Sequence, residues 1–137
     1  GRFYVEIKNA AVADIPLANK PKEYTPKGYV DLDLEWLSPI EIIVARAKEN
    51  KAWNEGPVPT MFTALYVINI KAGEQKQLTF PKNNKIDTSP QVVGSTITWY
   101  RTTAKENVGD VWVKDSIGGQ GHLWLKNVDS APTFFYK

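Results

Sequence analysis

Alternation of apolar and polar side chains along short segments is the feature that most restricts the fold of this chain. In residues 30–36, Val, Leu, Leu and Trp alternate with Asp, Asp and Glu. Residues 3–8, 95–101, 110–114 and 122–126 follow the same period of two. Because successive side chains of a strand point to opposite faces, this period is typical of half-buried strands. The sequence therefore predicts an all-β protein.

Further segments extend this prediction. Residues 61–70 are apolar in both phases, which indicates a central strand. Residues 75–80 are predicted to form a shorter strand, and residues 134–137 a terminal one. We expect about eight mainly antiparallel strands in a single domain over residues 1–137, arranged as a β-sandwich or a jelly roll. No internal repeat is visible in the sequence.

Residues 39–52 carry two conflicting patterns. Ser38 is followed by a proline and, three positions on, by Glu41, which together are typical of a helix start. The apolar residues that follow also fit helical spacing. Against a helix, residues 42–44 are a run of β-branched side chains, which lose rotamer freedom in helices. The prediction is a strand, with one short helix near residues 39–52 as the alternative.

Composition excludes several classes of site. The chain has no cysteine, which rules out disulfides and thiolate metal ligands, and a single histidine, which rules out multi-histidine zinc sites. The net charge of +2 is too small to indicate nucleic acid or an anionic membrane as a partner. No apolar run approaches the ~18 residues of a membrane helix. We expect no cofactor.

Asp31, Asp33 and Glu35 are the first candidate site. Alternate strand residues share a face and lie ~6.8 Å apart, so these carboxylates should line up on one side. They could then hold calcium or magnesium, or supply an acid/base pair for glycoside hydrolysis. A straight strand cannot wrap around an ion by itself, so we interpret the row as a solvated face. The three residues stay weak metal candidates.

Two other features fall short of catalytic motifs. His122 would need a serine or threonine nucleophile and an orienting carboxylate, and the chain has no G-x-S-x-G elbow. The glycine-rich stretch 118–121 lacks the GK[ST] ending of a phosphate-binding loop, and we interpret it as a flexible hairpin connection. We therefore expect a protein that is not an enzyme.

The segments 110–114 and 122–126 are predicted to form one hairpin with an aromatic outer face. Pairing Val113 with Leu123 puts four aliphatic side chains on one face, which should be the core. The same register sets Trp112 opposite Trp124 on the outer face. The polar neighbours of this expected platform are Asp110, Lys114, His122 and Lys126.

Three interpretations of the platform stay open. Another strand or the loop at residues 10–28 could cover it, it could be a subunit interface, or it could stack on sugar rings. Trp53, in the polar loop at residues 50–59, is a further candidate anchor for a partner or a membrane, unless it tucks against the sheet edge.

The leading functional hypothesis is a non-enzymatic, self-assembling structural subunit, such as a virion coat or decoration protein or an extracellular filament subunit. Its partners would be copies of itself or assembly neighbours, because aromatic patches mark interfaces. The alternative is a carbohydrate-binding module or lectin with glycans as ligands, and the third hypothesis is a membrane-active, pore-forming toxin. The chain begins at Gly1 without methionine, so we expect a mature processed chain in an extracellular or virion setting.

Overall fold

The computed structural model describes residues 6–7, 22–49, 61–82, 84–104, 106 and 108–132. In this part of the chain every regular element is a strand, and no helix is long and apolar enough to cross a membrane. The strands are β1 (Glu6–Ile7), β2 (Lys22–Glu23), β3 (Tyr29–Ser38), β4 (Glu41–Lys48), β5 (Ala64–Asn69), β6 (Gln75–Gln77), β7 (Lys85–Val93), β8 (Thr96–Thr103), β9 (Gly109–Lys114) and β10 (His122–Val128).

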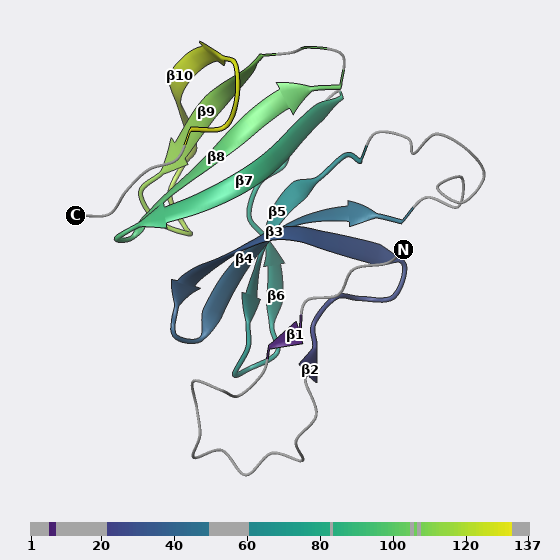
Figure 1. The fold of residues 1–137 in the computed structure, drawn as a ribbon. Coiled ribbons are helices and arrows are strands. Elements are labelled where there is room, and N and C mark those ends of the chain that lie inside the picture. The colour runs from purple at the N-terminus through teal and green to yellow at the C-terminus, as the bar shows by residue number, and fades with distance from the viewer. Residues whose placement is uncertain are drawn as a thin grey trace.

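The strands form two antiparallel four-stranded sheets and one small two-stranded pair (Figure 1). The first sheet has the order β3-β4-β5-β6, and the second has the order β10-β9-β8-β7. The sheets pack face to face, and β7 lies against β3, β4 and β5. The predicted all-β sandwich is confirmed. Each sheet is built from consecutive strands, so the crossing connections of a jelly roll are not seen.

The segment with conflicting patterns is a strand. β4 is central in the first sheet, and residues 42–47 are all buried. β-branched side chains suit this position because they pack well on a pleated surface covered on both sides. The short helix near residues 39–52 is therefore wrong for residues 41–48, and residues 50–60 lie outside the described part.

The shared interior lies between the two sheets. The first sheet contributes Ile43, Leu65 and Leu78, among others, and the second contributes Ile97 and Trp99. A second cluster covers the opposite face of the first sheet, where Tyr24 packs on Ile42, Val44 and Ile68. The first sheet is thus buried on both faces, which explains why its strands β4 and β5 lack clean alternation.

The two sheets repeat the same pairing register. In β3 and β4, Asp31 lies opposite Arg46 and Trp36 opposite Ile42; in β7 and β8, Asp87 lies opposite Arg101 and Val92 opposite Ile97. The third strands continue the match, because Tyr66 pairs with Val44 just as Trp112 pairs with Trp99. The structure therefore holds an internal repeat, although none is visible in the sequence.

The repeat includes a β-bulge in the first strand of each sheet. The ladder is irregular between Leu32 and Glu35 in β3, and at the equivalent place between Thr88 and Gln91 in β7. Asp33 and Ser89, inside these bulges, both have φ of 54°. The Ser89 amide donates to the Asp33 carboxylate at 3.0 Å, so the two bulges join the sheets.

Each sheet also holds a buried arginine–aspartate pair under an aromatic ring. Arg46 Nε and Asp31 Oδ1 are 2.6 Å apart, and Arg101 Nε and Asp87 Oδ1 are also 2.6 Å apart. A second guanidinium nitrogen bonds the other carboxylate oxygen in both pairs, so both are bidentate. The Arg46 guanidinium lies 4.9 Å from the Tyr66 ring centroid, and that of Arg101 lies 4.6 Å from Trp112.

These matches show that the sheets stack head to tail. The face of the second sheet that carries Trp99 and Trp112 packs on the first sheet, whereas the equivalent face of the first sheet, with Val44 and Tyr66, points away from the second. We call the faces that meet between the sheets inner and the other two outer. The outer face of the first sheet is therefore equivalent to the inner face of the second.

Candidate functional site

The three carboxylates of β3 do not share a face, because the bulge at Asp33 interrupts the strand. Asp31 is buried and accepts hydrogen bonds from Arg46 and from the Thr25 hydroxyl. Asp33 bonds the Ser89 amide, and Glu35 lies opposite Ile43 on the inner face. Within the described residues, no group of three or more His, Cys, Asp or Glu is placed to hold a metal ion. The prediction that the three carboxylates line up on one face is therefore wrong.

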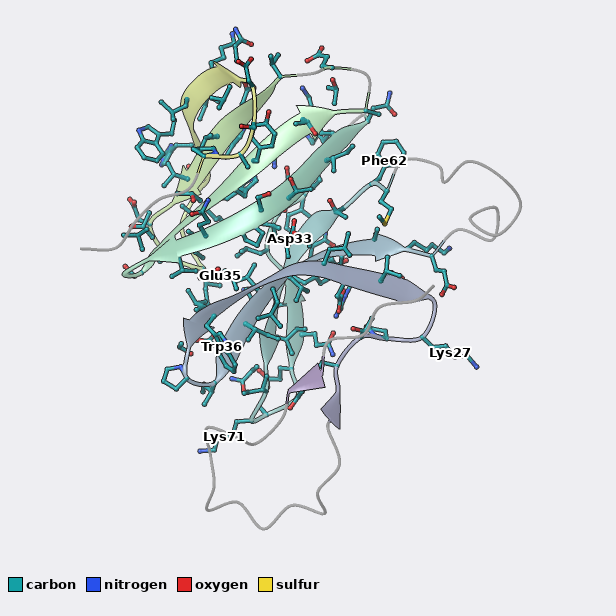
Figure 2. The ribbon with its side chains drawn as sticks, viewed as in Figure 1. Lys27, Asp33, Glu35, Trp36, Phe62 and Lys71 are labelled. Atoms are coloured by element: carbon teal, nitrogen blue, oxygen red, sulfur yellow. The ribbon has the colours of Figure 1, made fainter. Side chains whose placement is uncertain are left out.

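The bulge also turns Glu35 toward the second sheet and Trp36 away from it (Figure 2). Partial burial removes water from the Glu35 carboxylate, which raises its pKa. The folded state therefore holds a proton on this side chain more tightly than the unfolded chain does.

Replacing Glu35 with glutamine is expected to raise the free energy of unfolding at pH 7. A raised pKa in the folded state means that wild-type stability is lost as the pH rises through that pKa, and glutamine carries no charge to desolvate. At about pH 3, where Glu35 is protonated, the difference should vanish. Urea unfolding at both pH values measures it. Glu74→Gln, at an exposed position, is the matched control and should show no such gain; an equal gain from both variants would contradict the assignment.

The hairpin formed by β9 and β10 differs from its predicted register. Leu125 lies opposite Val111, as expected. The ladder is irregular between Leu123 and Leu125, so Leu123 lies opposite Trp112 instead of Val113. Trp112 and Trp124 are therefore not cross-strand partners, and the predicted two-ring platform is not formed.

Trp112 belongs to the shared interior. Its ring stacks on Trp99 with centroids 6.4 Å apart and an interplanar angle of 19°. Gly121 lies against both rings, since a Cβ there would be 3.2 Å from Trp99 and 3.7 Å from Trp112. Trp124, in contrast, is 52% exposed on β10. The prediction that Leu123 and Leu125 are core is also wrong, because both are exposed.

The polar residues predicted around the platform have separate surroundings. Asp110 accepts a hydrogen bond from the Asn127 amide at 3.1 Å. The Lys114 ammonium donates to the Leu78 carbonyl at 3.1 Å, and burial, followed by the charge of Lys76, lowers its pKa. His122 and Lys126 are exposed on β10. Trp53 lies outside the described residues.

The structure instead exposes an apolar patch that the sequence does not predict. Leu34 and Trp36 lie on the outer face of the first sheet with 43% and 47% of their surface exposed, and Ile40, in the following turn, is 40% exposed. We call these three residues the Trp36 patch. Simple alternation places Leu34 and Trp36 beside Val30 in the core. The bulge instead moves both side chains to the opposite face of the strand. The only sign of the bulge in the sequence is Asp33, because aspartate tolerates a positive φ better than most residues.

A separate open hollow of about 330 Å³ lies at the start of β5. It is lined by Phe62, Thr63, Ala64, Gln77, Pro81, Asn84 and Lys85. No residue that the sequence predicts as a site lines it.

No protein-family model matches the sequence, and no curated protein matches it. A solved structure described as a crystal structure of puromycin hydrolase is similar in fold, with a TM-score of 0.55 and 11% identity. The similarity covers 85% of this chain and 17% of that chain, so this chain spans less than a fifth of its length. At this identity, the likeness concerns the fold alone.

Proposed function

We propose that this chain is a non-enzymatic structural subunit that self-associates through the outer face of its first sheet. One observation carries the proposal. Val92 of β7 occupies the position equivalent to Trp36 and packs into the interior shared with the first sheet, and Pro90, equivalent to Leu34, is buried. The Trp36 patch therefore presents, on the surface, the positions that the fold uses for packing one sheet on another.

The chemistry of the patch suits a protein partner. Tryptophan is enriched in interfaces and among the residues that dominate binding energy, and contiguous exposed apolar residues on a soluble surface mark interaction sites. The rest of this face is already covered, because the Tyr24 hydroxyl donates to the Ile70 carbonyl at 2.7 Å and Tyr24 packs on Ile42. A second copy meeting the patch across a two-fold axis is the simplest symmetric contact.

Within this proposal we place the chain among virion coat, decoration or extracellular filament subunits, where such a contact would join neighbours. The carbohydrate-binding alternative loses its main support, because only one ring of the expected sugar platform is on the surface.

Trp36→Thr is expected to abolish self-association without unfolding the chain, because threonine keeps strand propensity at an exposed site. Sedimentation velocity across a wide concentration range measures the change. The wild type should shift from 15.4 kDa toward a dimer or larger species, and the variant should not. Trp124→Thr, the same substitution on the other sheet, is the control and should associate like the wild type. A wild type that stays monomeric throughout would contradict the proposal.

A further inference from the structure

We infer that the outer face of the second sheet is the docking face for a third four-stranded sheet of the same repeat, reached through residues 128–132. This inference goes beyond the proposed function and does not depend on it, because it concerns the opposite end of the stack.

The first argument is the equivalence of faces. The outer face of the second sheet corresponds, residue by residue, to the inner face of the first. Thr98, Tyr100, Val111 and Val113 occupy the positions of Ile43, Ala45, Leu65 and Val67. All four of the latter are buried at the contact with the second sheet. Thr98 and Val111 are already buried in this chain, whereas Tyr100 and Val113 are partly exposed. The surface that receives a sheet once in this chain is thus present a second time and is only partly covered.

The second argument is a matched pair of side chains, one directly after β6 and the other in β10. Gln77 pairs with Tyr66, and Leu123 pairs with the equivalent Trp112, so Leu78 and Trp124 occupy equivalent positions. Leu78 is 4% exposed in the shared interior, whereas Trp124 is 52% exposed. A position that the following sheet buries in the first unit is therefore half-exposed in the second.

The third argument is the path of the chain after each fourth strand. After β6, the Leu78 amide bonds the Leu65 carbonyl, and the chain then enters β7, which packs against β3. After β10, the Tyr100 hydroxyl donates to the Val128 carbonyl at 2.6 Å. The Gln91 side chain of β7 then donates to the Pro132 carbonyl. Residues 128–132 thus run from the fourth strand toward the first, as the chain does where it begins the second sheet.

The occupant follows from the contact that already exists. The second sheet presents Trp99, Trp112 and the Arg101–Asp87 pair to the first, and a third sheet would present the same kind of face to the second. This contact is heterologous, so the same face of another copy cannot reproduce it. The equivalent face of another copy, which is the outer face of its first sheet, is already covered in part by Tyr24. Successive four-stranded sheets stacked by radial repetition are the architecture of a β-propeller.

The test adds a third sheet to the chain at the position where the repeat predicts that it begins. Residues 1–130 are followed directly by a copy of residues 85–132, since residues 84 and 130 are equivalent in the two units. Both proteins are labelled with 5-fluorotryptophan, and the Trp124 signal is assigned in each by Trp124→Phe. We expect the solvent isotope shift of that fluorine signal to fall by at least half in the extended chain. The control carries Ile97→Asp and Trp99→Asp in the appended copy and should leave Trp124 exposed.

Several outcomes would overturn the inference. The first is an unchanged Trp124 signal in the folded extended chain, and the second is equal protection of Trp124 in the control. The third is protection of Trp124 in the natural chain as its concentration rises, because a second copy would then be the occupant of the face. If the direct join does not fold, the same copy attached to the intact chain through a flexible linker supplies the sheet at high effective concentration. Its failure to protect Trp124 would overturn the inference equally. None of the results on the extended chain depends on Trp36, so they are separate from the test of self-association.

Discussion

Replacing Asp87 with alanine is expected to lower the free energy of unfolding by about 3–5 kcal/mol, the cost of removing one partner from a buried ion pair. Asp87 is completely buried, and its carboxylate oxygens lie 2.6 Å and 2.9 Å from Nε and Nη2 of Arg101. The variant leaves the guanidinium beneath Trp112 without its counter-charge. Because the Arg101 side chain is 17% exposed and can reach some water, we expect the lower half of that range.

Urea unfolding of the purified chain measures the loss, and the repeat supplies a matched comparison. Asp31→Ala breaks the equivalent pair in the first sheet, where both side chains are almost fully buried, and should cost at least as much. The double variant Asp87→Leu with Arg101→Met should recover most of the loss, since replacing both partners by apolar groups of similar size is often neutral. A loss below about 1 kcal/mol for both single variants would show that these pairs are not needed for the stack.

The sequence predicts strands where one face is buried and the ladder is regular. It misses β7, because Ser89 and Pro90 interrupt the alternation at the bulge, and a proline normally argues against a strand. It leaves β4 ambiguous because both faces of that strand are buried. In each case the tertiary structure, and not the local pattern, decides which residues are covered.

The errors in the candidate site have the same origin. The bulge with positive φ at Asp33 turns Glu35 to the inner face and Trp36 to the outer face. This single bulge makes two predictions wrong: the row of three carboxylates on one face and the burial of Trp36. On β9, Val111 and Trp112 are adjacent and both pack into the protein, so alternation cannot tell which of them faces the interior.

The repeat is invisible in the sequence because equivalent positions share chemistry more than identity. The aspartate and arginine of the buried pair are the same residues in both sheets, but the ring above them is Tyr66 in one and Trp112 in the other. Bulge residues Asp33 and Ser89 share only a backbone conformation. A spaced Asp–Arg–aromatic pattern is the one signal that could have revealed the two units.

We expect Trp112→Ala and Trp124→Ala to lower the free energy of unfolding by very different amounts, although they are the same change on neighbouring strands. Trp112 stacks on Trp99 and contacts the Arg101 guanidinium, so its truncation should remove about 3–5 kcal/mol through lost burial and the cavity left behind. Trp124 is 52% exposed, and its truncation should cost less than about 1 kcal/mol.

Equilibrium urea unfolding of both variants decides between the two registers of the hairpin. Trp112→Phe should retain most of the stability that alanine loses, because it keeps an aromatic ring and removes an indole N–H that, within the described structure, is buried without a hydrogen-bond partner. Equal losses from Trp112→Ala and Trp124→Ala would mean that the rings have similar surroundings, as in the cross-strand pair predicted from alternation. A large loss from Trp112 alone requires the observed arrangement, because only a ring held between the two sheets has packing to lose.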